Sequence, residues 1–265
     1  MILAFVSRKG GVGKTTSVVN LGGALARLGS KVLIVDLDSQ ASASRSLGVP
    51  RAALAPSTHD VLFRGLALPE AVRPTSVEGL ELVTASADLL HADLDLQNLR
   101  RRDEALADRL APHAEAWDWI LLDCPPGLTA VVRNALVAAD AYVVPTPPHF
   151  LAFEGVDVLL EAVDRIHGRF GRGDALAGIL LTMVDYRTAS ARSHAAELRL
   201  KYGLKLLDTE IPVNVRLAES PTDGLTIFER DPKASGAHAY RMLAVELLDR
   251  LLPVPSTDGV EPVEN

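Results

Sequence analysis

The chain has 265 residues, a formal net charge of −7 and one cysteine, Cys124. This length can bury a substantial core. The negative charge gives no overall attraction to nucleic acid, so any DNA contact must come from a local basic patch. A single cysteine excludes an internal disulfide and fits a reducing cytosol. No stretch reaches the ~20 apolar residues of a membrane span, so we expect a cytoplasmic protein.

Apolar runs separated by helical patterns predict an α/β fold. The strands are expected at residues 2–6, 31–36, 80–84, 119–123, 141–145, 178–183 and 206–211, and a helix is expected at 14–28. Strands that alternate with helices indicate a mostly parallel sheet flanked by helices, with functional loops at the carboxyl ends of the strands. We expect one domain over residues 1–252, an irregular excursion at 48–77 and a disordered tail at 253–265.

A glycine-rich loop follows the first strand and leads into the first helix. Its glycines allow backbone N–H groups to point at phosphate oxygens, and the helix N-terminus adds partial positive charge. Lys14 is expected to reach the β- and γ-phosphates, and the Thr15 hydroxyl is expected to ligate Mg²⁺. The sequence therefore predicts an ATP–Mg²⁺ site formed by Lys9, Gly10, Gly11, Val12, Gly13, Lys14, Thr15 and Thr16.

The loop departs from the general P-loop pattern because Arg8 stands where that pattern has glycine, and a second lysine, Lys9, follows it. The form Lys-Gly-Gly-Val-Gly-Lys-Thr resembles the deviant Walker A motif of the ParA/MinD family of ATPases. The resemblance implies a three-layer P-loop fold and an ATP-dependent homodimer in which Lys9 contacts the partner's phosphates. The alternative for Lys9 is a solvated surface lysine.

Acidic residues end two of the predicted buried strands. Asp36 and Asp38 follow one of them, and Asp123 ends another. A buried carboxylate is costly unless it meets a cation or hydrogen-bond donors. By the family resemblance, Asp38 positions or deprotonates the attacking water near Mg²⁺, and Asp123, as the Walker B aspartate, holds Mg²⁺ through water. Either aspartate could instead cap the following helix.

The C-terminal part resembles small chromosomal ParA proteins of the Soj type, through residues 181–188 and 211–221. By that resemblance, Met183, Pro212 and Asn214 lie near the adenine, while Arg187 and Arg216 bind DNA non-specifically in the dimer. The residues alone support this less strongly, because acidic side chains are interspersed among the basic ones. A solvated helix face with mixed charges remains the alternative for both arginines.

The resemblance implies a slow, Mg²⁺-dependent partition ATPase. The ATP-bound dimer would attach to the nucleoid, and a ParB-like or adaptor protein would stimulate hydrolysis and release. The cargo is a chromosome or plasmid or, alternatively, a protein assembly such as a carboxysome or a chemoreceptor cluster. A MinD-like membrane role needs a basic amphipathic C-terminal helix, and residues 240–252 carry no cationic excess. An iron–sulfur relative of this fold needs more cysteine than Cys124.

Overall fold

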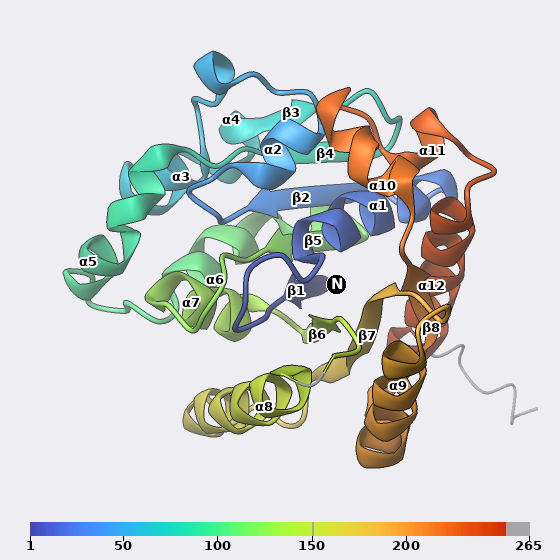
Figure 1. Cartoon of the computed structure of the whole chain (residues 1–265). Helices are drawn as coiled ribbons and strands as arrows, with labels where there is room; N and C mark the ends of the chain where they lie inside the picture. The colour runs from blue at the N-terminus through green and yellow to red at the C-terminus, as the bar shows by residue number, and fades with distance from the viewer. Residues whose placement is uncertain (150, 253–265) are drawn as a thin grey trace, which may run out of the picture.

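An eight-stranded sheet runs through the centre of the molecule (Figure 1). The computed structural model describes residues 1–149 and 151–252, so the predicted tail at 253–265 lies outside the described residues. The strands are β1 (Ile2–Phe5), β2 (Val32–Asp36), β3 (Val72–Pro74), β4 (Leu80–Val83), β5 (Trp119–Asp123), β6 (Ala141–Thr146), β7 (Leu176–Val184) and β8 (Leu206–Pro212).

The strand order is β3-β4-β2-β5-β1-β6-β7-β8, and every pair is parallel except β3 with β4. The seven predicted strands are present. The prediction of an irregular excursion at 48–77 was wrong, because that segment contains two short helices and the antiparallel edge strand β3. β3 has only three residues and ends in Pro74, a residue that fits an edge strand and gives no apolar run to recognise.

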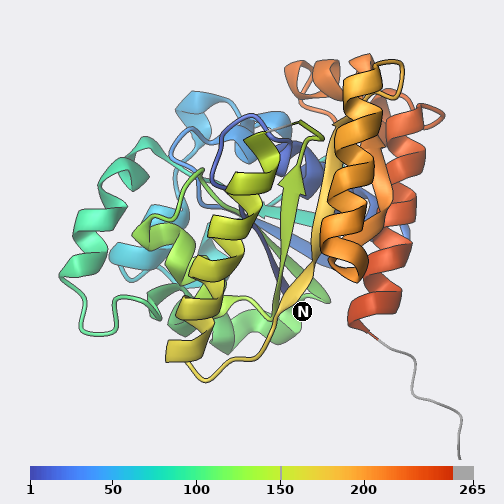
Figure 2. The same cartoon turned by 60° about the horizontal axis from the view of Figure 1, so that its bottom comes forward.

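The helices are α1 (Lys14–Arg27), α2 (Ser42–Ser46), α3 (Thr58–Phe63), α4 (Leu68–Ala71), α5 (Ala92–Gln97), α6 (Ala105–Leu110), α7 (Ala130–Ala138), α8 (Leu151–Arg169), α9 (Ala189–Tyr202), α10 (Val215–Glu219), α11 (Ile227–Arg230) and α12 (Ser235–Leu251). Short 3₁₀ turns include η1 (Arg51–Ala53) and η5 (Ser220–Thr222). Figure 2 shows the long helices packed along the sheet on both of its faces.

The two faces of the sheet carry separate hydrophobic cores, because successive strand residues point to opposite sides. On β2, Leu33 and Val35 join the core under α3 and α5–α9, whereas Val32 and Ile34 join the core under α1, α11 and α12. All five β2 residues are buried. A strand covered on both faces therefore appears in the sequence as a continuous apolar run, which is why β2 was predictable.

The order β2-β5-β1 places the carboxyl ends of these three strands side by side. Asp36 at the end of β2 is in register with Asp123 at the end of β5, and Asp123 is in register with Phe5 at the end of β1. The glycine-rich loop leaves β1 at this edge, next to both aspartates. In an open parallel sheet, ligands bind at the carboxyl ends of the strands, so the candidate site lies where the topology places such sites.

Candidate nucleotide site

Backbone conformation explains two of the loop glycines. Gly11 and Gly13 have φ values of 73° and 87°, a left-handed region that side chains other than glycine rarely adopt. Gly13 is the N-cap of α1, and the helix begins directly at Lys14. Residues Lys9, Gly10 and Gly11 are exposed. The loop therefore has the backbone conformation and the helix N-terminus that the predicted phosphate site requires.

Lys14 is held over the loop by hydrogen bonds to its own segment. Its Nζ donates to Ser7 Oγ at 2.8 Å and to the Lys9 carbonyl oxygen at 3.3 Å. Burial lowers the pKa of Lys14, while the nearby Asp123, Cys124 and Asp38 oppose that shift. A buried ammonium close to two aspartates is a strong point charge in a region of low dielectric, where a phosphate gains most from it.

Thr15 and Asp123 meet at the start of α1. Thr15 Oγ1 donates to Asp123 Oδ2 at 2.8 Å, whereas Asp123 Oδ1 is buried and has no hydrogen-bond partner in the described part of the chain. Burial raises the pKa of Asp123, and the adjacent Asp36 adds to the shift. A buried carboxylate oxygen with no donor is costly unless a cation or an ordered water meets it. This pair therefore fits Mg²⁺, which takes one or two protein oxygens and completes its shell with phosphate and water.

Other possible metal ligands are sparse around this pair. Across residues 1–149 and 151–252, no three His, Cys, Asp or Glu side chains lie close enough together to hold a metal ion. The arrangement thus differs from an all-protein cage such as a structural calcium site.

Asp36 and Asp38 play different parts although they are two residues apart. Asp36 is fully buried and accepts hydrogen bonds from Ser44 N at 2.9 Å, Ser44 Oγ at 2.7 Å and Asp38 N at 3.1 Å. Asp38 is half-buried, its Oδ1 accepts from Gln40 N at 2.9 Å, and its charge acts on Lys14. Asp36 therefore organises the segment after β2, and Asp38 is the carboxylate that lies toward the loop.

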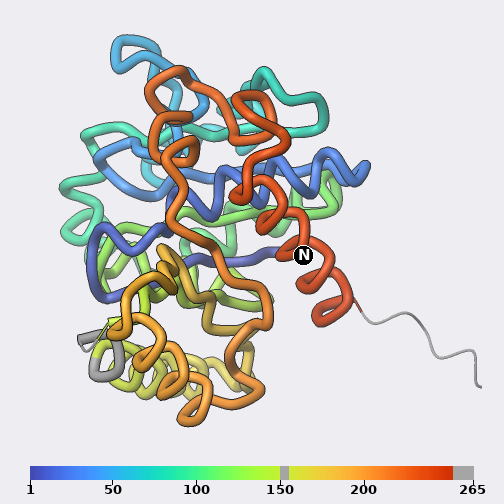
Figure 3. Tube along the Cα trace, turned by 45° about the vertical axis from the view of Figure 1, so that its right-hand side comes forward, coloured from blue at the N-terminus to red at the C-terminus, as the bar shows by residue number. Residues whose placement is uncertain are grey.

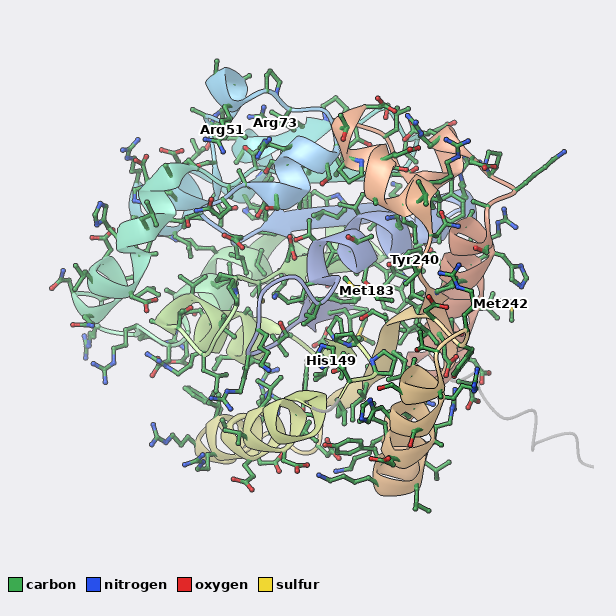
Figure 4. All side chains as sticks on the ribbon, viewed as in Figure 1. Arg51, Arg73, His149, Met183, Tyr240 and Met242 are labelled. Atoms are coloured by element: carbon green, nitrogen blue, oxygen red, sulfur yellow. The ribbon has the colours of Figure 1, made fainter. Side chains whose placement is uncertain are left out.

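A cavity of about 270 Å³ adjoins the loop on the β7–β8 side. It is lined by Gly13, Thr16, Met183, Pro212, Ile211, Asn214, Leu217 and Tyr240, among others. Figure 4 shows Met183 and Tyr240 close to one another beside α1. The structure thus brings together the three side chains predicted near the adenine, in an apolar pocket next to the phosphate loop.

Three local features shape that cavity. Met183 has φ 53°, a left-handed conformation that is uncommon for a residue other than glycine. The preceding Thr182 donates from Oγ1 to the Val12 carbonyl oxygen at 2.9 Å, which ties the end of β7 to the loop. Asn214 caps α10 by accepting from Leu217 N at 3.2 Å, and its Nδ2 donates to Ser235 Oγ at 2.8 Å. Asn214 therefore has a structural role whatever it binds.

The two predicted DNA-contacting arginines lie on different elements. Arg187 precedes α9, is 85% exposed and pairs with both carboxylate oxygens of Asp185. Arg216 lies on α10 and pairs with Glu219 at 2.9 Å. Both guanidinium groups reach solvent, but each is already matched by a carboxylate of its own chain. A DNA phosphate has to compete with these exposed ion pairs, which are individually weak.

Sequence reasoning missed several residues that complete the site. Ser7 accepts a hydrogen bond from Lys14, Thr182 on β7 donates one to the loop, and Ser44 donates one to Asp36. Ser7 was open to prediction because it stands between the first strand and the loop. Thr182 bonds to a residue 170 positions away, and Ser44 lies within a short helix. No spacing pattern in the sequence marks either residue.

The described residues contain no helix that is both long and apolar enough to cross a membrane. Residues 1–173 match the family model described as an AAA domain. The chain is 43% identical over 250 residues to the chromosome-partitioning ATPase Soj of Thermus thermophilus, covering 94% of this chain and 96% of that protein. It is 38% identical to the chromosome partitioning protein ParA of Caulobacter vibrioides, covering 94% of each.

Solved structures agree with this fold. A cobyrinic acid a,c-diamide synthase from Mycobacterium smegmatis, crystallised with ADP and magnesium, superposes with a TM-score of 0.82 at 33% identity, over 95% of both chains. The cell division ATPase MinD of Pyrococcus furiosus superposes with a TM-score of 0.77 at 26% identity, over 93% of this chain and 97% of that one. With its P-loop fold and its deviant glycine-rich loop, the chain belongs to the ParA/MinD family of ATPases and resembles the Soj-type partition proteins.

Proposed function

We propose that the chain is a ParA-type partition ATPase that binds ATP with Mg²⁺ and hydrolyses it slowly. The convergence of Lys14, Thr15 and Asp123 carries this proposal, because it joins a cationic phosphate ligand to a hydroxyl and a buried carboxylate oxygen that lacks a donor among the described residues. Relatives crystallised with ADP or an ATP analogue and magnesium support it. When bound, Mg²⁺ neutralises charge on the phosphate oxygens.

The remaining catalysis is positioning and charge stabilisation, which this chain's own groups supply. Loop N–H groups and Lys14 would hold the phosphates, and Thr15 and Asp123 would hold the metal. Asp38 would orient the attacking water or accept its proton. Asp36 remains within the fold, where it fixes the segment that carries Asp38.

Replacing Asp38 tests the catalytic assignment. Asp38→Ala should lower ATP hydrolysis by about 10²- to 10⁴-fold, the usual contribution of a positioned base, while ATP affinity changes little. Phosphate release and ATP binding are measured on the same preparations. Asp249→Ala, at the exposed end of α12, removes one carboxylate elsewhere and should hydrolyse ATP like the parent protein. Parent-like hydrolysis by Asp38→Ala would contradict the role of Asp38.

We propose that Lys9 acts across a homodimer whose formation requires ATP. The presence of a second loop lysine, which the general P-loop pattern lacks, and the exposure of this residue support the proposal. The Asp38→Ala variant should then accumulate as an ATP-bound dimer, as measured by size-exclusion chromatography with light scattering. Lys9→Ala in the same background should stay monomeric with ATP. A dimer that forms equally without Lys9 would contradict the assignment in trans.

In the ATP-bound dimer, Arg187 and Arg216 of both protomers would bind DNA phosphates without reading sequence. We infer that this attaches the protein to the nucleoid, and that a ParB-like or adaptor protein stimulates hydrolysis and release. The identity shared with ParA and Soj favours a chromosome or plasmid as cargo. A protein cargo is the second candidate, the alternative that the family resemblance leaves open. The likeness to Cyanothece McdA, at a TM-score of 0.82 and 21% identity, concerns the fold alone.

We further propose that Met183, Pro212 and Asn214 receive the adenine. Their common cavity and its position against Gly13 and Thr16 support this, since a nucleotide whose phosphates lie on the loop extends toward it. We also propose that residues 1–252 act as one domain. In support, all eight strands form one sheet, and α12 packs on both α1 and β8.

A further inference from the structure

A groove of about 580 Å³ lies between α2, with the turn that follows it, and η5. Both walls are short surface segments that contact each other, although about 180 residues separate them in sequence. Arg45 and Arg51 line one wall, and Thr222 and Asp223 line the other. The groove is within the size range of small-ligand sites, but its lining is polar. It lies apart from the residues assigned to ATP.

Two unpaired guanidinium groups dominate the charge of the groove. The side chains of Arg45 and Arg51 are exposed and make no hydrogen bond or ion pair with residues 1–149 or 151–252. Among the described lining residues, the one carboxylate is that of Asp223, and Arg230 pairs with it. The groove is therefore net positive. A guanidinium without a carboxylate partner suits phosphate, which it can bind through two parallel hydrogen bonds.

The walls of the groove are held together by backbone packing. Gly48 and Gly224 both have positive φ, and a Cβ on Gly224 would lie 2.6 Å from Gly48 Cα. That distance admits no side chain at position 224 without movement of the backbone. The hydroxyl groups of Ser42 and Thr222 also line the groove and can act as hydrogen-bond donors.

The groove borders Arg216, the residue assigned to DNA under the proposed function. Helix α10, which carries Arg216, ends where η5 begins. Glu219 Oε2 accepts from Arg216 at 2.9 Å and from Arg230 at 3.0 Å, and Arg230 in turn pairs with Asp223 in the groove wall. Figure 1 shows α2 and α10 beside one another, and Figure 4 shows Arg51 on the same side of the molecule.

We propose that this groove is a further phosphate-binding site for the DNA backbone, with Arg45 and Arg51 as its ligands. It would extend the contact surface that begins at Arg216. The inference rests on the proposed DNA-binding function and adds residues to it. DNA is the favoured ligand because the groove is open, polar and continuous with an arginine already assigned to phosphate, and because its hydroxyl and guanidinium groups offer hydrogen-bond donors to an anionic chain.

The groove is also linked to the nucleotide site. Ser44 lies on α2 between groove residues Ser42 and Arg45, and it is bound to Asp36 through both its backbone N and its hydroxyl. Asp36 accepts in addition from the backbone N of Asp38. One hydrogen-bonded segment thus carries both a wall of the groove and the carboxylate assigned to catalysis. We therefore expect the groove to contribute to DNA binding when ATP is bound.

The test is the salt dependence of DNA binding, measured by fluorescence anisotropy with a labelled duplex and ATP–Mg²⁺ at several salt concentrations. Removing one phosphate contact reduces the magnitude of the slope of log K against log salt by about 0.9. The slope of the double variant Arg45→Ala/Arg51→Ala should therefore be smaller by about two units per protomer, and this variant should bind DNA more weakly. Its ATP affinity without DNA should equal that of the parent protein.

Two further double variants control for charge and folding. Arg100→Ala/Arg109→Ala removes two exposed arginines near α5 and α6, whose side chains also lack a partner among the described residues, and should keep the parent slope. Arg45→Lys/Arg51→Lys keeps both charges and should keep most of the slope, because lysine binds phosphate as a point charge.

The outcomes separate the two proposals. If Arg45→Ala/Arg51→Ala keeps the salt slope and the DNA affinity of the parent protein while Arg216→Glu loses DNA binding, only the proposal for the groove is overturned. An equal reduction of the slope in Arg100→Ala/Arg109→Ala would also overturn it, because the effect would then follow net charge. A parent protein that binds no DNA with ATP would overturn the proposed DNA function and the groove together.

Discussion

Single side chains at the phosphate loop have roles that their neighbours define. Lys14 is buried, yet within the described residues its ammonium is held by Ser7 and the Lys9 carbonyl rather than by a carboxylate. Because these acceptors are neutral oxygens, the Lys14 ammonium does not have to break an ion pair with either of them to meet an incoming phosphate. Asp123, by contrast, has one oxygen that meets no donor in the described part of the chain, beside Thr15. In the proposed ATP site, Lys14 would therefore meet the phosphate anion and Asp123 the metal cation.

Removal of the Lys14 ammonium should weaken ATP binding. Hydrogen bonds to charged groups contribute about 1.5–3 kcal/mol, so Lys14→Ala should bind ATP roughly tenfold to more than a hundredfold more weakly. Isothermal titration calorimetry with ATP–Mg²⁺ measures the change. Lys31→Ala removes an exposed lysine before β2 and should bind ATP like the parent protein. Equal ATP affinities for the parent protein and Lys14→Ala would contradict the assignment of the loop as the nucleotide site.

The buried Asp36 should leave a mark on the pH dependence of stability. Burial raises its pKa from 3.8 to about 6. Between these values the folded state holds a proton that the unfolded state has released, so this residue's contribution to the unfolding free energy falls as pH rises. Asp36→Asn cannot ionise and keeps an oxygen that accepts from Ser44.

Denaturant unfolding from pH 4 to 7, without nucleotide or metal, measures this effect. The unfolding free energy of Asp36→Asn should rise relative to that of the parent as pH increases toward about 6. A difference between the two proteins that stays constant over this range would show that Asp36 does not carry the shift. Exposed carboxylates such as Asp185, whose pKa is lowered by Arg187, are present in both proteins and cancel in the comparison.

At the scale of elements, the carboxyl ends of the strands assemble the site from distant segments. The runs that form β1, β2 and β5 were predictable because each is buried on both faces, and the glycine loop was predictable because its spacing is specific. The pocket beside Met183 could not be derived from spacing. It depends on the packing of α12 against α1, β7 and β8, and on a hydrogen bond from Thr182 to a residue 170 positions away.

The cap of α10 allows a test of the adenine pocket. Asn214→Asp keeps the oxygen that accepts from Leu217 N but removes the amide donor. If that amide contacts the adenine, ATP affinity should fall by roughly 2- to 10-fold, the equivalent of one hydrogen bond, and the preference for ATP over GTP should narrow. Competition with a fluorescent ATP analogue gives both quantities.

Ser235→Ala is the matched control, because it removes the partner of Asn214 Nδ2 and leaves the amide in place. It should retain the parent preference for ATP. If Asn214→Asp also retains the parent affinity and preference, Asn214 is only the cap of α10.

At the scale of the whole molecule, the two arginines proposed to contact DNA lie on separate elements, Arg187 before α9 and Arg216 on α10. The net charge of the chain is −7, and both Arg187 and Arg216 are paired with carboxylates. Figure 3 shows α9 and α10, drawn in shades of orange, at separate heights on one side of the molecule. A DNA duplex that contacted both helices would have to span the distance between them. Such weak, dispersed contacts fit an attachment that becomes effective when a dimer doubles them.

This arrangement of charges could not be predicted from the sequence. The order of basic and acidic residues does not say which pairs form, because the ion pairs of Arg230 with Asp223 and Glu219 depend on how η5 and α11 fold. For the same reason, Arg45 and Arg51, which are unpaired among the described residues, could not be told apart from the paired arginines. Pairing of charges is a property of the fold, whereas the loop motif is a property of the local sequence.

In the proposed function, ATP switches the attachment of the protein to DNA. The most direct measurement is the affinity of the parent protein for a labelled duplex of arbitrary sequence, at low and at physiological salt, with ATP–Mg²⁺, with ADP–Mg²⁺ and without nucleotide. We predict that the protein binds DNA with ATP–Mg²⁺ but not with ADP–Mg²⁺ or without nucleotide. If about six phosphates are contacted, the affinity should fall by about 10³-fold or more between about 50 and 200 mM salt. Equal binding in all three nucleotide states, or binding insensitive to salt, would contradict the claim.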